Sequence, residues 1–282
     1  MNRDEKEINN MYYEALEQDL YVDLSEQIEH PPVALSMGTY DITDYKGNRR
    51  TYPVPLVTYG NFAFVSAPPK TYKSFFMSLL ASAYLSGTTR FTGEIKGHRD
   101  DKDLYMFDTE QGNFHAQRGF RRVADMSGTS EGLHTFALRS ISYKDRIGFI
   151  EWCLEKADEG SVGLVIIDGI ADLVSDVNNI EETNLITQKI MQLSTKYNCA
   201  IILVIHFNYN SRKAVGHLGS FLEKKAETQI ELYRDLEEDS KTINVTPKLS
   251  RNISFEPFDF YVNKYGLPQV IRNPEGGYGN DF

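Results

Sequence analysis

The feature that most constrains the fold of this chain is a repeated alternation between short apolar runs and longer amphipathic runs. The runs "VGLVIIDGI" and "AIILVIH" are almost wholly apolar, as strands buried on both faces of a sheet are. Amphipathic segments such as "YKDRIGFIEWCLEKADEG" have helical periodicity and separate these strands. The alternation predicts an α/β fold, with a mostly parallel sheet and helices on both faces. Three short C-terminal strand candidates predict an antiparallel edge: "ETQIELYR", "KTINVTPK" and "FDFYVNK".

Composition sets limits on the class of protein. Hydrophobic residues make up 41% of the 282 residues, enough to fill a core. No apolar run approaches the roughly 18 residues of a membrane span, and the first ten residues are too charged for a signal peptide. Cys153 and Cys199 lie far apart without a metal-binding spacing, which excludes a disulfide framework and a zinc site. We therefore expect a soluble, cytoplasmic protein with no membrane partner.

The charge is unevenly distributed. The formal net charge is -10, and the acidic residues are partly concentrated in residues 1–30. This balance excludes a protein that coats nucleic acid through a broad basic surface, but it leaves room for a local basic loop.

Changes in pattern divide the chain into three parts. Residues 1–55 contain a polar, acidic helical stretch followed by a hairpin-like run, and we expect them to form an extension. A packed first layer of the main domain is the alternative for this segment. The strand–helix alternation occupies residues 56–265, and residues 266–282 form a C-terminal tail.

The stretch Ser66–Phe75, "SAPPKTYKSF", resembles a phosphate-binding loop of the form G-x-x-x-x-G-K-[ST] without its glycines. It follows a predicted strand and opens a predicted helix, which is the context such a loop requires. Without glycine, the loop must avoid left-handed geometry at Tyr72 or accept strain there. Lys73 would neutralise the β- and γ-phosphates and Ser74 would bind Mg²⁺. The expected nucleotide-contacting residues are Ala67, Pro68, Pro69, Lys70, Thr71, Tyr72, Lys73, Ser74 and Phe75.

Three further candidates lie where predicted strands end, at the edge where an open α/β sheet binds its ligands. Asp168 ends "LVIID" and would complete the Mg²⁺ shell, unless it only caps the next helix. Glu110 in "YMFDTEQ" would orient the attacking water, with Asp108 as its near-neighbour or simply solvated. His206 ends "AIILVIH" and would sense the γ-phosphate, unless it is structural. These residues predict a site for ATP and Mg²⁺.

The order of these motifs resembles the RecA-like ATPases of the DnaB/RepA hexameric helicase group. The resemblance is closer to RepA-like ATPases of bacterial mobile elements and covers roughly residues 56–265. It implies a RecA-like P-loop NTPase that assembles as a ring or filament of identical subunits. The resemblance depends on the segments "FDTEQ", "ALRS", "IIDGIADLVSDVNN", "LSTKYN", "VIHFN", "GHLGS" and "KKAET".

The resemblance also implies residue roles. Lys73, Ser74, Asp168, Glu110 and His206 take the phosphate, metal, base and sensor roles described above. "KLSRN" at 248–252 is similar to a basic stretch that hexameric helicases present to the neighbouring subunit's γ-phosphate, although here one extra residue separates Lys248 from Arg251. Arg251 is thus the expected finger in trans and Arg234 in "ELYRD" is its competitor. An exposed strand arginine is the alternative for both.

The segment "FNYNSRKAVGHLGS" follows His206, where RecA-like proteins carry a loop that faces DNA. Arg212, Lys213 and His217 would contact single-stranded DNA and Tyr209 would stack on a base. An unrelated surface loop is the alternative.

The favoured interpretation is an ATP-hydrolysing motor of a mobile element that acts on single-stranded DNA, with a replication or mobilisation protein as a further partner. The alternative is a nucleotide-binding switch or adaptor, and a P-loop kinase ranks third because no arginine-rich lid is evident.

Overall fold

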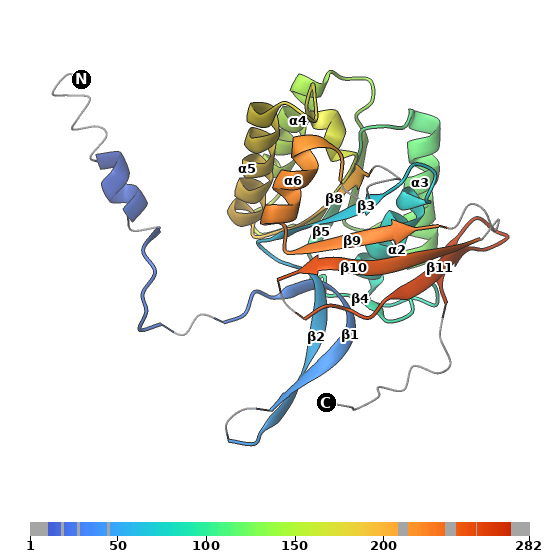
Figure 1. Cartoon of the computed structure of the whole chain (residues 1–282), viewed down its shortest axis with the longest axis horizontal. Helices are drawn as coiled ribbons and strands as arrows, with labels where there is room; N and C mark the ends of the chain where they lie inside the picture. The colour runs from blue at the N-terminus through green and yellow to red at the C-terminus, as the bar shows by residue number, and fades with distance from the viewer. Residues whose placement is uncertain are drawn as a thin grey trace. The chain divides into compact units, whose positions relative to one another are not determined.

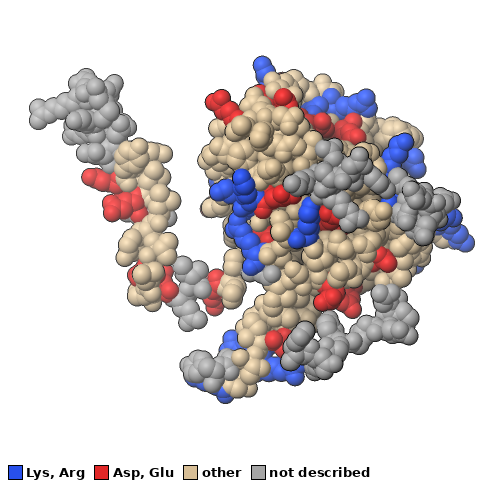
Figure 2. Space-filling model, viewed as in Figure 1, with Lys and Arg blue, Asp and Glu red and all other residues tan. Residues whose placement is uncertain are grey.

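The computed structural model describes residues 11–17, 20–26, 29–43, 46–207, 214–234, 241–251 and 253–271. The chain divides into two compact units, Met1–Pro31 and Pro32–Phe282. The described part of the first unit contains a short helix over residues 11–17 and exposes Asp and Glu but no Lys or Arg (Figure 2). No helix in the described segments is long and apolar enough to cross a membrane.

The second unit contains a large sheet, a small sheet and the helices that cover them (Figure 1). Its strands are β1 (Val33–Thr43), β2 (Arg49–Thr58), β3 (Phe62–Ala67), β4 (Ile95–Gly97), β5 (Asp103–Asp108), β6 (Leu133–Ala137), β7 (Val162–Asp168), β8 (Ala200–His206), β9 (Thr228–Tyr233), β10 (Thr242–Ser250), β11 (Phe258–Val262) and β12 (Pro268–Val270). Its helices are α2 (Lys73–Ser86), α3 (Asn113–Ser127), α4 (Tyr143–Glu155), a 3₁₀ turn (Ile170–Leu173), α5 (Ile180–Lys196) and α6 (Gly216–Lys225).

The large sheet has the order β12-β11-β10-β9-β3-β8-β7-β5-β6. From β9 to β6 all neighbouring strands are parallel, whereas β10, β11 and β12 add antiparallel pairs at the other edge. The predicted fold class is therefore confirmed: a mostly parallel sheet with helices on both faces and an antiparallel C-terminal edge.

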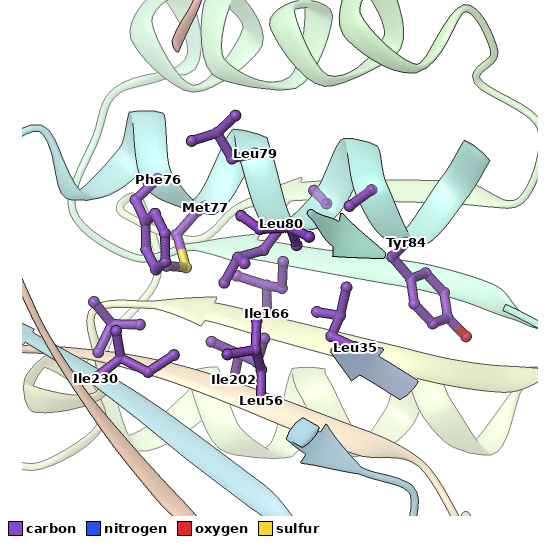
Figure 3. Close-up of a cluster of buried hydrophobic side chains, with 14 of the residues drawn as sticks. Leu35, Leu56, Phe76, Met77, Leu79, Leu80, Tyr84, Ile166, Ile202 and Ile230 are labelled. Carbon is purple, nitrogen blue, oxygen red and sulfur yellow. The ribbon is translucent and has the colours of Figure 1, made fainter. Parts of the chain in front are cut away.

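Two hydrophobic clusters form the core, one on each face of the sheet. Helix α2 belongs to the first cluster and is buried on nearly every side, because its sequence "KSFFMSLLASAYLS" is apolar all round. Figure 3 shows Phe76, Met77 and Leu80 of α2 directed towards Ile166 and Ile202 of the sheet. The second cluster lies beneath α4, α5 and α6. This burial holds the start of α2 in place at the end of β3.

The hairpin formed by β1 and β2 pairs with β4 in the small sheet and belongs to the second unit. Its inner half packs into the first cluster through Leu35 and Leu56, which are almost fully buried. Its outer half is largely exposed over residues 40–43 and 46–51. The short strand β4 is not evident from the sequence, because three residues show no periodicity.

Candidate functional site

Four parallel strands bring the predicted site residues to one edge of the sheet. In the strand register, Ala67 at the end of β3 pairs with His206 at the end of β8. Asp108 at the end of β5 pairs with Asp168 at the end of β7. Residues 68–72 connect β3 to α2 above this edge. The residues predicted to bind phosphate and metal and to act as base and sensor therefore lie at the same edge of the sheet.

The phosphate-loop candidate adopts left-handed backbone geometry without glycine. Lys70 has φ 63° and Tyr72 has φ 56°, a region that costs an L-residue roughly 1–2 kcal/mol. Of the two possibilities for a loop without glycine, avoiding left-handed geometry or accepting its strain, the second is therefore the one observed. Where left- and right-handed residues alternate, successive backbone amides can face one concave surface, which is an arrangement suited to anions. The N-terminus of α2 adds its positive dipole end at the same place.

We expect Lys70→Gly to stabilise the protein by about 0.5–1 kcal/mol, because glycine removes the left-handed cost but increases the entropy of the unfolded chain. Urea unfolding followed by circular dichroism measures the change. Lys264→Gly is the matched control, since Lys264 is also exposed but has no positive φ, and this control should lose stability. Destabilisation of Lys70→Gly to the level of the control would contradict the assigned backbone strain.

Lys73 is the buried cation of the loop, with only 8% of the residue exposed. Its Nζ donates to the carbonyl oxygen of Pro68 at 3.2 Å and contacts Nδ1 of His206 at 3.0 Å. Burial lowers the pKa of Lys73, and the charges of Asp168 and Glu110 oppose that shift. The ammonium is therefore partly desolvated and positioned to exchange these contacts for phosphate oxygens.

Ser74 and Asp168 form the candidate metal pair. The Ser74 hydroxyl donates to Oδ2 of Asp168 at 2.7 Å. Loss of hydration raises the pKa of Asp168 to about 6, while the hydrogen bond from Ser74 opposes the rise and the nearby charge of Asp108 adds to it. A cation at this position would relieve the cost of the buried negative charge. The donor set, one hydroxyl and one carboxylate, is of the oxygen type that Mg²⁺ takes together with phosphates and water.

His206 links Lys73 to Glu110. Because an ammonium only donates, Nδ1 of His206 accepts the Lys73 bond and the proton of the neutral ring is on Nε2. That Nε2 lies 3.8 Å from Oε2 of Glu110. Contact with the ring is the largest cause that lowers the pKa of Glu110, and burial opposes it. Glu110 is therefore an ionised carboxylate with a largely exposed side chain, able to accept a proton or orient a water.

Asp108 fixes the backbone at Glu110, and Gln111 connects Asp108 with Ser74. The contacts of Gln111 were not predicted from the sequence. Asp108 is 5% exposed, and its Oδ1 accepts from the backbone amides of Glu110 and Gln111 at 3.1 and 2.8 Å. The Gln111 carboxamide donates to Oδ2 of Asp108 at 2.9 Å and lies 3.5 Å from Oγ of Ser74. Asp108 is thus a buried near-neighbour rather than a solvated group. The sequence signal that could have indicated these contacts is the position of Gln111, a polar residue directly after Glu110.

Two aromatic rings, each in contact with one guanidinium group, lie at the end of the loop. The Arg234 guanidinium lies 4.9 Å from the Tyr72 ring, and Tyr72 meets Phe75 edge to face at 5.3 Å. The Arg122 guanidinium lies 3.8 Å from the centre of the Phe75 ring and donates to the Ser78 hydroxyl at 3.3 Å. These contacts place Arg234 beside the phosphate loop of its own chain. Tyr72 makes its contacts in the left-handed conformation.

Arg251 lies at the opposite end of the sheet from the phosphate loop. It follows β10, whose last residue Ser250 pairs with Thr228 at the start of β9. Its amide donates to the Glu227 carbonyl at 2.9 Å and its guanidinium to the Lys225 carbonyl at 2.8 Å. In its own chain Arg251 therefore caps the C-terminus of α6 and is too distant to contact the phosphates. Lys248 contacts Glu223 and Glu231.

The expected DNA-contacting segment is only partly described. Tyr209, Arg212 and Lys213 lie outside the described residues. A bridge between Phe207 and Ala214 closes the base of this segment directly after His206. His217 is exposed in the first turn of α6 rather than in a loop. The helix begins there because Gly216, with φ 68°, lets the backbone approach the Val177 carbonyl, where a Cβ would come within 2.5 Å.

Comparison with known proteins identifies the family to which this fold belongs. A family model described as an AAA domain matches residues 47–212, which is more than half of the chain, and the chain therefore belongs to this family. The protein is an ATPase domain of the P-loop class, to which nucleotide binding is general. None of the curated proteins matches the chain significantly. The matched range includes Lys73, Glu110, Asp168 and His206 but ends before Arg234 and Arg251.

Proposed function

We propose that this protein is a Mg²⁺-dependent ATPase motor of the RecA-like helicase group that acts on single-stranded DNA. The observation that carries the proposal is the series of contacts from Lys73 through His206 to Glu110, beside the pair formed by Ser74 and Asp168. The residues proposed as phosphate-binding cation, sensor and base thus contact one another in turn, and the proposed metal pair includes Ser74, the residue that follows Lys73. The assignment to a replication ATPase of a mobile element is supported by the sequence resemblance.

Nucleotide binding begins with exchange of hydrogen bonds at Lys73. The nucleotide's phosphates would replace Pro68 and His206 as acceptors, and the amides of residues 70–75 would donate to the same oxygens. The described residues contain no cluster of three or more His, Cys, Asp or Glu that would hold a metal alone. Ser74 and Asp168 would therefore hold Mg²⁺ jointly with the phosphates, and the ion would supply positive charge against the charge of the phosphates.

Hydrolysis needs a group that orients water in line with the γ-phosphate. Glu110 is suited to this role because its carboxylate is ionised and its backbone is fixed by Asp108. Once Lys73 turns to the phosphates, Nδ1 of His206 loses its donor and the ring is released from one of its two contacts. His206 can then respond to the γ-phosphate, and the segment that starts at Phe207 is its immediate continuation in the chain. This connection couples the nucleotide state to the segment containing Tyr209, Arg212 and Lys213.

The deciding experiment measures steady-state ATP hydrolysis with and without single-stranded DNA. A motor should hydrolyse ATP several-fold faster with single-stranded DNA and only weakly respond to duplex DNA. Slow turnover that DNA leaves unchanged would instead favour the nucleotide-binding switch. Removal of Mg²⁺ with a chelator should stop turnover in either case, which separates the metal requirement from the DNA question.

Glu110→Gln should retain ATP binding while hydrolysis falls about 10²–10⁴-fold, because the amide preserves shape but cannot accept the proton. Binding of a fluorescent ATP analogue and phosphate release measure the two effects separately. Glu131→Gln, an equivalent change at an exposed position, should leave both unchanged. Turnover near the unmodified rate in Glu110→Gln would transfer the base role to another carboxylate.

A further inference from the structure

A buried hydrogen bond connects the end of β5 with the turn that follows β7. Thr109 lies between Asp108 and Glu110 in the chain and is only 1% exposed. Its hydroxyl donates to Oδ2 of Asp172 at 2.8 Å, and its backbone amide donates to the Asp168 carbonyl oxygen at 3.1 Å. None of the roles in the ATPase chemistry described above falls to Thr109 or Asp172.

The Thr109 hydroxyl has three acceptors within reach and a single proton to donate. The carbonyl oxygens of Asp168 and Gly169 lie at 3.1 and 3.0 Å, and Oδ2 of Asp172 lies at 2.8 Å. A hydrogen bond to a carboxylate is shorter and stronger than one to a neutral carbonyl. The distances and the chemistry thus both direct the proton at Asp172.

Asp172 is held in place through its backbone. It lies in the 3₁₀ turn Ile170–Leu173, where its amide donates to the Gly169 carbonyl oxygen at 3.2 Å. Its carbonyl oxygen accepts from the Arg146 guanidinium of α4 at 2.8 Å. The turn and the helix therefore fix the acceptor to which Thr109 donates.

Gly169 leaves the space that this hydrogen bond needs. A Cβ at position 169 would lie 2.8 Å from Oγ1 of Thr109 and 3.0 Å from Oδ2 of Asp172. Contacts of this length are too close for a carbon atom, so a side chain would push the two partners apart. The φ of Gly169, 124°, also favours glycine. The backbone directly after Asp168 therefore accommodates the bond only without a side chain.

We propose that the hydrogen bond between Thr109 and Asp172 positions Glu110 for hydrolysis. The strand pairing between β5 and β7 ends with Asp108 and Asp168. The bonds of Thr109 extend this connection to the residue that directly precedes Glu110. The proposal rests on the function proposed above, in which Glu110 orients the attacking water. Thr109 and Asp172 are positioning residues, since they act through Glu110.

The expected effect is selective for the chemical step. Loss of the hydroxyl frees the backbone before Glu110 on one side, while Asp108 still accepts from the Glu110 amide on the other. A displacement of about 1 Å in a catalytic group can cost about 10²-fold in rate. Nucleotide binding should persist, because Lys73 and Ser74 belong to α2 and make no contact with Thr109 or Asp172 through their listed bonds to His206 and Asp168.

Thr109→Val removes the hydroxyl and nearly preserves the shape of the side chain. We expect kcat for ATP hydrolysis to fall about 10–10²-fold. The Kd for a fluorescent ATP analogue and the Mg²⁺ concentration for half-maximal turnover should stay unchanged. Thr109→Ser retains the donor and should recover most of the lost rate. Rescue by serine, together with the selective fall in kcat, distinguishes positioning from a general structural role.

Thr183→Val is the matched control. Thr183 is fully buried in α5, and its hydroxyl donates to the Asn179 carbonyl oxygen at 2.6 Å. The same substitution there should lower the unfolding temperature without changing kcat. Asp172→Ala breaks the proposed bond from its other side at a half-buried position. This variant decides the question even if Thr109→Val fails to fold.

A double-mutant cycle tests whether the two residues act through one bond. If they do, Thr109→Val combined with Asp172→Ala should hydrolyse ATP no more slowly than the slower single variant. Losses that multiply in the double variant would show two independent effects and would overturn the proposal. An unmodified kcat in Thr109→Val, or an equal loss of kcat in Thr109→Ser, would overturn it as well.

These outcomes are separate from a failure of the proposed function. If Glu110→Gln lacks turnover while Thr109→Val hydrolyses ATP at the unmodified rate, Glu110 keeps its role and only the positioning inference is wrong. If Glu110→Gln itself hydrolyses ATP near the unmodified rate, the assignment of the base fails, and the positioning inference fails with it.

Discussion

Lys73→Ala is expected to abolish ATP turnover, with a loss of at least about 10²–10³-fold, and to weaken nucleotide binding in parallel. The magnitude follows because this ammonium is a partly desolvated cation at the proposed phosphate site, where preorganised charge has its largest effect on the transition state. Its own contacts are one backbone carbonyl and His206. We therefore expect little change in fold stability, since a neutral truncation also removes the cost of burying a charge.

The measurements are isothermal titration with ATP, steady-state turnover and thermal unfolding. Lys264→Ala removes an exposed lysine from a distant turn and should match the unmodified protein in all three. If Lys73→Ala binds and hydrolyses ATP as the unmodified protein does, residues 67–75 are not the phosphate-binding loop. A large drop in unfolding temperature would show that the lost activity reflects misfolding instead.

Arg251→Ala is expected to reduce turnover by about 10³–10⁵-fold while ATP binding persists, provided that Arg251 completes the active site of a neighbouring subunit. In its own chain Arg251 caps α6 through Lys225, far from the phosphate loop. Any catalytic effect must therefore come from the next subunit. Specific activity should also rise with protein concentration, because each site needs two chains.

Mixing Arg251→Ala with Glu110→Gln tests this directly. Some interfaces of a mixed assembly join an intact Glu110 to an intact Arg251, so two inactive proteins should regain partial activity. If no activity returns although mixed assemblies form, Arg251 does not act in trans.

The same experiment must distinguish the loss of the hydrogen bond that caps α6 from a loss of catalysis. Loss of the Lys225 hydrogen bond should cost about 0.5–1.5 kcal/mol of stability, which urea unfolding detects and which mixing does not repair. Arg234→Ala serves as a comparison, because Arg234 lies beside Tyr72 of its own loop. A loss of activity in Arg234→Ala should therefore not be rescued by mixing with Glu110→Gln.

The amino-acid sequence by itself determined the parallel core and the chemistry of its edge. The runs that became β7 and β8 are too apolar and too short for anything but buried strands. Once those strands are parallel, the residues that end them must share one edge of the sheet. Asp168 and His206 could therefore be predicted as neighbours of Lys73 from their positions alone.

Only the tertiary structure decided how these residues are connected and oriented. Tyr72 combines a left-handed φ with contacts to Phe75 of the adjoining helix and to Arg234 after β9, and the contact with Arg234 joins segments far apart in the sequence. The bond between Lys73 and His206 and the support of Glu110 by Asp108 depend on side-chain rotamers and strand register. Arg251 is distant from the loop because β10 runs antiparallel to β9. Local periodicity specifies which elements form and which face they bury, whereas pairings between distant segments specify which side chains meet.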